Sequence, residues 1–326
     1  MKKIIYTITV FLTMCFGLNA YTLRENVKET LSKRGVKQNI IDETSDFLLD
    51  SRGEMSIIPQ QDEIDSLIAK AEMLLKKDRN NIVIKQYLST MYLKKGGNKN
   101  TLKAQKINEE NLKDKGITDF ERWSVTGLYY YQIGEKKKAQ TYFNKIKEKY
   151  KDKPAVYNLI EIVTMDIDML KDSKDFNEFM VNTATNEKKM TKMQEIAKKQ
   201  VEKIKIVKDF FQTEENKREF GVVDELVYSF DLLLNLSKIN EIMQKDLKQA
   251  GGFKTKTVKE ATDYYLKNVA NNEKMTEDSI KYSIILENMY LRIISTLVSA
   301  DEKESTDFSN KLEKSKLYEI MRKLEE

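Results

Sequence analysis

Apolar residues recur at spacings of three and four through most of the chain, which is the period of one helix face. The segment 190–211 shows this period clearly, and the run 280–298 is the most apolar stretch after the amino-terminal residues. A Thr with an acidic residue three positions later, as at Thr257 and Glu260, is typical of a helix start. The pattern predicts the following helices: two short ones within 24–51 around Gly35, then 190–211, 222–236, one opened by Thr257, one opened by Thr276 over 280–298, and 306–324.

The composition favours the same class. The 326 residues include only two Pro and eleven Gly, and Lys, Glu, Leu and Ile are abundant. Few turn formers and many helix formers are typical of long helices and not of turn-rich β structure. The sequence therefore predicts an all-α protein.

The first twenty residues have the layout of a secretory signal peptide. Lys2 and Lys3 precede the apolar run 4–16, and the small residue Ala20 stands just before Tyr21. We therefore expect residues 1–20 to be removed on export and the mature chain to begin near Tyr21. The compartment that follows from this is the periplasm or the cell envelope.

Two other interpretations of this segment remain open. Cys15 could be a lipidated cysteine, although Met14 stands where a small residue is expected. The segment could also stay as an anchor, but its apolar core is shorter than the roughly 20 residues that a bilayer needs. We expect no later membrane span, because the run 280–300 carries Glu287 and Arg292.

The middle of the chain contains internal repeats. Three similar blocks begin near Ile82, Phe120 and Pro154. The second block is the clearest, with a Trp, two Gly, a Tyr, an Ala and a Phe at characteristic intervals: Trp123, Gly127, Tyr130, Gly134, Ala139 and Phe143. In these residues the chain resembles the tetratricopeptide repeat (TPR) family.

The resemblance implies a packing role for each of these positions. Gly127 would let one helix approach the next, Trp123 and Tyr130 would fill the space between them, and Ala139 and Phe143 would face them from the second helix. The first block repeats the scheme and the third keeps part of it, with these residues: Leu88, Ser89, Tyr92 and Gly96, then Tyr157 and Ile160. The alternative is a set of ordinary helical hairpins with coincidental aromatic residues.

The repeats suggest a domain organisation. Residues 1–20 are the expected signal peptide, 21–60 a helical cap and loop, 61–170 the TPR-like repeats, and 171–326 a helical bundle or degenerate repeats. Because a repeat cannot bury its apolar face alone, we expect the carboxyl-terminal helices to stack on the array. A single continuous α-solenoid is favoured over two domains hinged near 171–187.

In the TPR family, ligands lie in a groove lined by the first helix of each repeat. Transferred to this chain, the positions that line it carry apolar side chains and amides and no ring of Lys or Arg. This mixture suits a partner helix or extended segment with apolar anchors; the alternative for each residue is packing against a neighbouring helix. The predicted groove residues are Gln86, Thr90, Leu93, Ser124, Leu128, Tyr131, Gln132, Asn158 and Ile162.

Eight lysines lie within 188–208, and the same predicted helix carries four acidic residues: Glu187, Glu195, Glu202 and Asp209. The favoured interpretation is a solvated helix face with charge pairs four residues apart. The alternative is a peripheral contact with anionic membrane or cell-wall polymer. The net charge is only +5 and aromatic residues are not interleaved with these lysines, so we expect no nucleic-acid partner.

The composition also excludes several kinds of enzyme. The chain has no His and one Cys, which removes Ser-His and Cys-His nucleophiles, imidazole ligands and Cys-rich zinc sites. Glycine-rich phosphate loops and calcium loops are missing from the sequence as well. We expect no catalysis, cofactor or metal, and we interpret the chain as an exported protein-binding scaffold of the envelope. A small-molecule binder would show a deep apolar pocket with converging polar groups, which the sequence does not locate.

Overall fold

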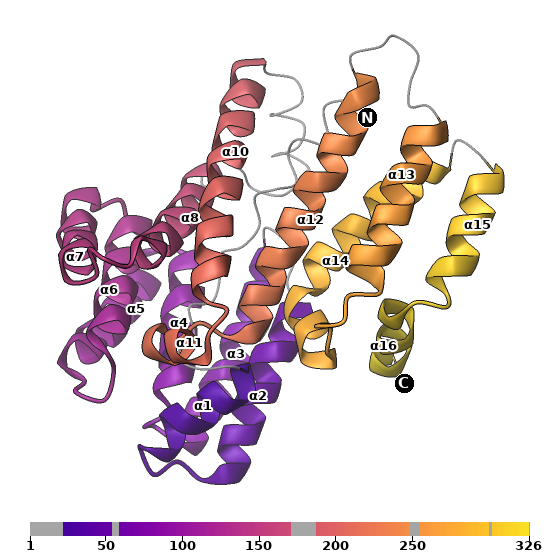
Figure 1. Ribbon diagram of the computed structural model, residues 1–326. Helices are drawn as coiled ribbons and strands as arrows, with labels where there is room; N and C mark the ends of the chain where they lie inside the picture. The colour runs from indigo at the N-terminus through magenta and orange to yellow at the C-terminus, as the bar shows by residue number, and fades with distance from the viewer. Residues whose placement is uncertain (1–21, 54–58, 171–186, 248–254, 300–301, 326) are drawn as a thin grey trace.

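The computed structural model describes residues 22–53, 59–170, 187–247, 255–299 and 302–325. Every regular element within these ranges is a helix (Figure 1), which confirms the all-α class. The predicted signal peptide 1–20, with Cys15, lies outside the described residues, and so does most of the candidate hinge at 171–187.

The helices in the described ranges follow one another through short connections. They are α1 (Leu23–Ser32), α2 (Gln38–Gly53), α3 (Gln61–Lys77), α4 (Ile82–Lys95), α5 (Asn98–Lys113), α6 (Asp119–Gln132), α7 (Lys136–Lys149), α8 (Pro154–Leu170), α10 (Glu187–Phe210), α11 (Glu214–Phe220), α12 (Asp224–Leu247), α13 (Thr255–Tyr265) with the π-helical turn η2 (Leu266–Ala270), α14 (Glu277–Val298), α15 (Glu302–Leu312) and α16 (Lys316–Glu325).

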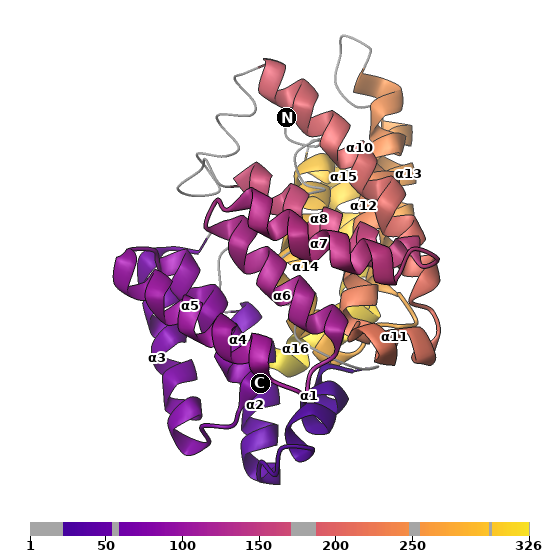
Figure 2. The same cartoon turned by 90° about the vertical axis from the view of Figure 1, so that its left-hand side faces the viewer.

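In the amino-terminal half, helices that are consecutive in the sequence pack against each other. Each helix from α3 to α8 contacts the next one, and α1 and α2 form a further pair that contacts α3 and α4. Figure 2 shows these helices in successive layers. The connections are short because the turns use glycine: Gly134 has φ +84° between α6 and α7, a conformation that side chains rarely adopt.

Helices α6 and α7 have the most extensive interface among the described helices. Thr118 caps α6 in a reciprocal arrangement with Glu121, which fixes where the helix begins. A Cβ atom added at Gly127 would lie 2.4 Å from the Phe143 ring, so only glycine fits the observed spacing of the two helices.

All the packing residues predicted for the second block lie in this hairpin. Ala139 and Phe143 are buried in α7, and Trp123 and Tyr130 on α6 are partly buried against the core. Tyr130 stacks on Tyr142 with ring centroids 5.8 Å apart. In the first block Leu88 and Tyr92 are also buried, in α4.

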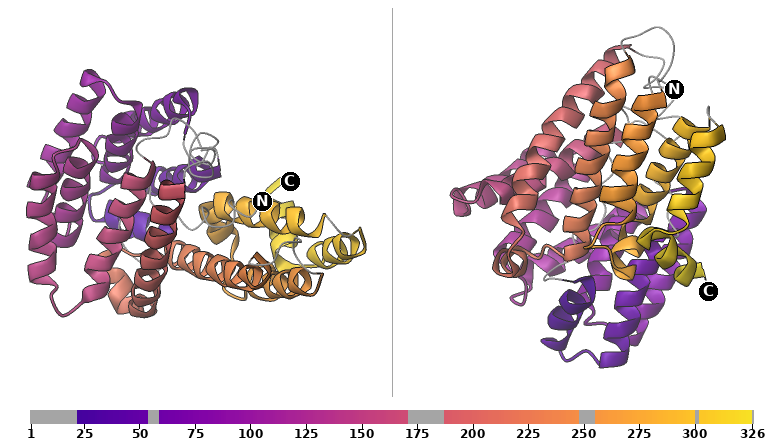
Figure 3. Two further views of the ribbon diagram at one scale, coloured as in Figure 1. Left: turned by 90° about the horizontal axis from the view of Figure 1, so that it is seen from above. Right: turned by 45° about the vertical axis from the view of Figure 1, so that its right-hand side comes forward.

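The carboxyl-terminal half is built from longer helices. Helix α10 packs on α8 and α12, α12 packs on α13 and α14, and α14 also contacts α2, α15 and α16. Seen from above in Figure 3, α12 to α16 lie to one side of the amino-terminal helices. Contacts through α8–α10 and α2–α14 join the two halves, and the buried apolar residues from Leu23 to Ile320 form one continuous cluster.

Polar contacts at the start of α1 reinforce this junction. The backbone N–H of Leu23 donates to Glu225 of α12 over 3.0 Å, and both groups are buried. The Arg24 guanidinium donates to Asp278 of α14 over 2.6 Å and to Asp46 of α2 over 2.7 Å. Helix α1 is therefore attached to the carboxyl-terminal half at its first turn.

Two of the predicted helix boundaries were wrong. The single helix predicted over 306–324 is broken into α15 and α16, because the Ser315 hydroxyl accepts a hydrogen bond from the Tyr318 N–H over 3.2 Å and begins a new helix. Thr257 does not open a helix, since α13 already begins at Thr255 and Thr257 is buried inside it. The prediction that Thr276 opens α14 is confirmed, with the Thr276 side chain accepting from the Ser279 N–H.

Replacing Gly127 with Ala tests the close approach of α6 and α7. Helix propensity alone favours Ala by about 1 kcal/mol, but the added methyl group meets a buried aromatic ring, and overpacking of this kind costs about 1–3 kcal/mol. We expect the free energy of unfolding, measured by urea denaturation, to fall by roughly 1 kcal/mol. Adding Phe143→Leu should reduce the cost of Gly127→Ala, because the smaller side chain leaves room; a Gly127→Ala protein as stable as the parent would contradict the packing.

Candidate functional site

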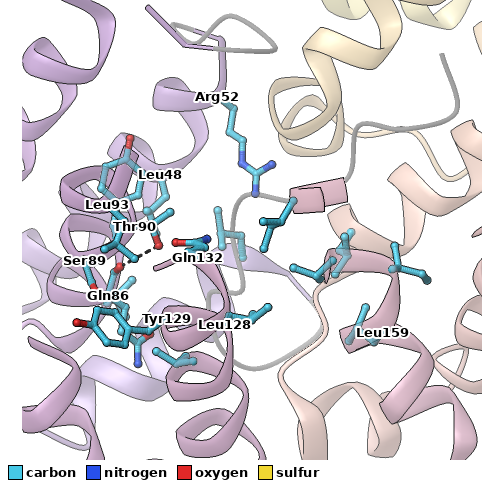
Figure 4. A pocket seen from close by; sticks show the side chains of 18 of the residues that line it. Leu48, Arg52, Gln86, Ser89, Thr90, Leu93, Leu128, Tyr129, Gln132 and Leu159 are labelled. Atoms are coloured by element: carbon cyan, nitrogen blue, oxygen red, sulfur yellow. Dashed lines mark hydrogen bonds between the residues drawn. The ribbon is translucent and has the colours of Figure 1, made fainter. Parts of the chain in front are cut away.

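An apolar cavity of about 100 Å³ lies along the inner faces of α4, α6 and α8. Residues of α1, α2, α12 and α14 close it, so seven helices contribute to its wall (Figure 4). The lining residues are Leu23, Leu48, Arg52, Val83, Gln86, Tyr87, Ser89, Thr90, Leu93, Val125, Leu128, Tyr129, Gln132, Leu159, Ile162, Val163, Ile167, Leu226, Phe230 and Tyr282.

The structure brings six of the nine predicted groove residues to this cavity. They occupy matching faces of three helices, as residues with a common position in successive hairpins should. Three come from α4, two from α6 and one from α8: Gln86, Thr90, Leu93, Leu128, Gln132 and Ile162.

The other three predicted residues are not part of the cavity lining. The Ser124 hydroxyl donates to the backbone oxygen of Glu121 over 3.1 Å, and Ser124 is buried. The Tyr131 hydroxyl donates to Asp168 over 2.6 Å. Asn158 accepts from Lys203. Each of the three therefore contacts its own or a neighbouring helix, which was the alternative left open for them.

The closing wall was not foreseen from the sequence. Leu226 and Phe230 of α12 and Tyr282 of α14 line the cavity although they lie far along the chain from the predicted repeats. Nothing in their local sequence distinguishes them from other apolar residues of an amphipathic helix. Their role is set by the packing of the carboxyl-terminal helices on the amino-terminal ones, which is a long-range property.

Arg52 is the one charged residue among those that line the cavity. Its guanidinium carbon lies 3.8 Å from the centroid of the Tyr282 ring, so the group is held in a cation–π contact between α2 and α14. The hydroxyl of Thr90 donates to the Gln86 backbone oxygen, and that of Ser89 donates to the Ala104 backbone oxygen. The amide of Gln132 is solvent-exposed at the cavity.

Burying the side-chain amide of Gln86 in the cavity wall costs free energy. The residue is only 6% exposed, and neither atom of its side-chain amide has a hydrogen-bond partner in the described part of the chain. Leaving a buried polar group unsatisfied costs about 1–3 kcal/mol. Buried polar groups without a hydrogen-bond partner are found preferentially at functional sites, which agrees with the position of Gln86 at this cavity.

The lysines of α10 fall into two groups. Lys203 pairs with Glu161 of α8, and Lys208 pairs with Asp231 of α12, so these two help to pack α10 against its neighbours. The other lysines of this stretch whose exposure is described are solvent-exposed: Lys188, Lys192, Lys198, Lys199 and Lys205. The exposed face is therefore less basic than the sequence alone suggests.

A buried carboxyl group lies apart from the cavity, between α12 and α14. Glu287 is fully buried, and its Oε1 accepts from the Tyr228 hydroxyl over 2.9 Å. Burial raises the pKa of Glu287 to about 7. Perturbed carboxyls can mark catalytic sites, but Glu287 does not line the cavity and has no exposed surface through which a substrate could reach it.

The pKa of Glu225, whose carboxylate accepts a hydrogen bond from the backbone N–H of Leu23 in α1, is raised as well. Burial raises its pKa to about 7, and Asp278 and Asp224 act in the same direction. The hydrogen bond from Leu23 opposes this shift. Two carboxyl groups of the carboxyl-terminal half are thus poised to ionise near neutral pH.

None of the helices in the described ranges has the length and apolar character needed to cross a membrane. Within the same ranges, no cluster of three or more His, Cys, Asp or Glu residues is arranged to hold a metal ion. Comparisons of the chain with protein-family models, with curated proteins and with solved structures gave no match. The site is therefore interpreted from its own geometry.

Glu287→Gln tests the buried carboxyl. As pH rises from about 4.5 to about 7, the carboxyl ionises in the unfolded chain but stays protonated in the folded one, so the free energy of unfolding falls. Over this interval the loss amounts to about 3 kcal/mol, at about 1.4 kcal/mol per pH unit. We expect the free energy of unfolding of Glu287→Gln, taken relative to that of the parent, to be higher at pH 8 than at pH 5. Urea denaturation at both pH values measures it.

The matched control is Glu202→Gln on the exposed face of α10, which should leave the pH dependence unchanged. Glu225 stays in every protein and contributes a slope of the same sign, so the comparison between Glu287→Gln and the parent is the informative quantity. Identical slopes for these two proteins would show that Glu287 is not the buried group responsible.

Proposed function

We propose that this chain is an exported, non-catalytic adaptor or scaffold of the bacterial cell envelope that holds a segment of another protein in the cavity along α4, α6 and α8. The observation that carries the proposal is the meeting of six predicted groove residues at one apolar cavity. In this proposal the amino-terminal helices are a TPR-like α-solenoid of hairpins.

Two features support the TPR-like interpretation. Helices that follow one another in the sequence pack in order from α3 to α8. The pair α6 and α7 has a glycine, Gly127, where the two helices come too close for a side chain, with Phe143 against it. The export signal rests on the sequence of residues 1–20 and the position of Tyr21.

The physical mechanism is burial of apolar anchors in a preformed cavity. Leu93, Leu128 and Ile162 offer aliphatic walls on three successive helices. Fully burying one aliphatic side chain contributes about 1.5–3 kcal/mol. Because the helices already hold these walls in place, little ordering of the receptor opposes binding.

A second candidate function is a peripheral contact with anionic membrane or cell-wall polymer. It is supported by the exposed lysines of α10, among them Lys192, Lys198, Lys199 and Lys205. The internal pairing of Lys203 reduces the charge available on this face, so we rank it below protein binding.

Leu128→Ala tests binding at the cavity. Peptides selected from a displayed library against the whole chain serve as defined probes, and their dissociation constants are measured by fluorescence anisotropy. Loss of an aliphatic contact worth about 1.5–3 kcal/mol should weaken binding by about tenfold or more. Tyr131→Phe is the control, because Tyr131 does not line the cavity and its variant should bind as the parent does.

Leu93→Ala provides a second variant, because Leu93 is only partly buried and its truncation is less disruptive to folding than that of Leu128.

Salt concentration distinguishes the two candidate functions. Binding at the cavity should persist between about 0.05 and 0.5 M salt, whereas binding through the α10 lysines should be lost at the higher concentration. Peptides that bind Leu128→Ala and Leu93→Ala as tightly as the parent, and that dissociate at high salt, would refute protein binding at the cavity.

A further inference from the structure

A groove of about 340 Å³ is lined by residues of α10, α12 and α13. Helix α12 packs against both of the other helices, and Figure 1 shows it running between them. The groove shares no lining residue with the cavity along α4, α6 and α8. It is therefore a separate place on the molecule at which a ligand can be held.

The walls of the groove carry charges of both signs. Helix α10 contributes Lys205 and Lys208, and α12 contributes Asp231, Lys238 and Glu241. Lys208 pairs with Asp231. Lys238 pairs with Glu241 over 2.8 Å, so most of this charge is already compensated within the groove.

This balance of charge favours a neutral, hydroxylated ligand. An ion entering the groove would have to compete with the existing pairs and lose its own hydration. A hydroxyl group both donates and accepts hydrogen bonds, so it can bond to a carboxylate and to an ammonium group without separating the pair.

Tyr264 of α13 is the aromatic residue of the groove lining. Its hydroxyl donates to the Asn235 side chain of α12 over 2.9 Å, and the Asn235 amide donates to the backbone oxygen of Asn268 over 3.4 Å. The Asn268 side chain donates in turn to the Tyr264 backbone oxygen over 2.9 Å. These hydrogen bonds hold the ring in place, and an aromatic ring offers an apolar surface to the carbon-bound hydrogens of a sugar ring.

The groove adjoins an irregular part of the helical structure. Tyr264 lies in the last turn of α13, which continues directly into the π-helical turn η2. Asn268, which bonds to both Asn235 and Tyr264, belongs to η2. Short π-helical turns are rare and occur frequently at functional sites. The position of η2 is thus a second observation, independent of the lining, that indicates a ligand at this groove.

The size and apolar content of the groove also suit a sugar. Its volume of about 340 Å³ is at the lower end of the range of about 300–1,000 Å³ that is usual for small-molecule sites. Val201 of α10 and Leu234 of α12 add a small apolar surface to that of Tyr264. Polar groups outnumber apolar ones, which favours a polyhydroxylated molecule over a lipid.

We propose that this groove binds a neutral saccharide of one or two rings, with a sugar face on the Tyr264 ring and hydroxyl groups hydrogen-bonded to Lys205, Lys238 and Glu241. This goes beyond the proposed function, because it assigns a ligand of another class to a different part of the molecule. An adaptor with both sites would hold a polypeptide at the cavity and a glycan at the groove.

Saturation-transfer NMR of the whole chain tests the proposal with three neutral disaccharides: maltose, cellobiose and N,N′-diacetylchitobiose. At least one of them should bind saturably, with a dissociation constant of about 1 mM or lower. Digalacturonate is an anionic probe of the same length, and chitobiose is a cationic one. Both should bind more weakly than the best neutral disaccharide, because each would disturb a charge pair of the groove.

Variants of Tyr264 locate the site. Tyr264→Leu should weaken binding of the best disaccharide about tenfold through loss of the ring. Tyr264→Phe keeps the ring and should bind more tightly than Tyr264→Leu. Tyr318→Leu on α16 is the matched control, since Tyr318 is 44% exposed and does not line the groove, and it should bind as the parent does.

Glu241→Gln keeps the proposal testable if Tyr264→Leu fails to fold. Glu241 is solvent-exposed, and its carboxylate is a stronger hydrogen-bond acceptor for a sugar hydroxyl than a neutral amide is. The substitution should therefore weaken binding severalfold. Glu202→Gln, on the exposed face of α10 and outside the groove lining, should leave the affinity unchanged.

The proposal is wrong if none of the three neutral disaccharides binds saturably at concentrations up to about 10 mM. It is also wrong if digalacturonate or chitobiose binds more tightly than all three, or if folded Tyr264→Leu or Glu241→Gln keeps the affinity of the parent. Binding of the selected peptides is measured separately and at the cavity, so none of these results would change the outcome for the proposed function.

Discussion

The inner faces of α4, α6 and α8 carry more apolar surface than their own hairpins can bury. Val156 and Leu159 of α8 are almost fully buried, and the core that contains them runs without a break into Leu233 and Leu236 of α12. A stack of hairpins exposes such a face unless a neighbouring element covers it. Here α10 packs on α8, and residues of α1, α2, α12 and α14 close the cavity along α4, α6 and α8.

Helices from a distant part of the chain can cover an apolar face only if the two halves keep a fixed position relative to each other. Polar contacts at the junction contribute to this, since hydrogen bonds are directional and apolar burial is not. The backbone N–H of Leu23 donates a hydrogen bond to the Glu225 carboxylate. The Gln200 amide of α10 donates to Asp166 of α8 over 2.5 Å, and both residues are buried. Because burial raises the pKa of Glu225 and of Glu287 to about 7, we expect the stability of the carboxyl-terminal half to depend on pH near neutrality.

The helical period was sufficient to predict the all-α class, and the positions transferred from the resemblance to the TPR family included six residues of the cavity lining. Gln86 and Thr90 are four residues apart, as are Leu128 and Gln132, so each pair lies on one helix face whatever the tertiary structure. The period could not predict that Tyr131, next to Gln132, turns to Asp168, because that choice depends on how α6 meets α8. The break before α16 depends on one serine cap, a signal too short to find in a periodic segment.

The one charged residue of the cavity lining lies outside the predicted groove positions. The predicted groove positions carry mainly apolar and amide side chains and no ring of Lys or Arg. The cation is supplied from outside the repeats, by Arg52 at the end of α2, and it is positioned by Tyr282 of α14. The elements that close the cavity therefore contribute its charged residue, while α4, α6 and α8 contribute most of its lining.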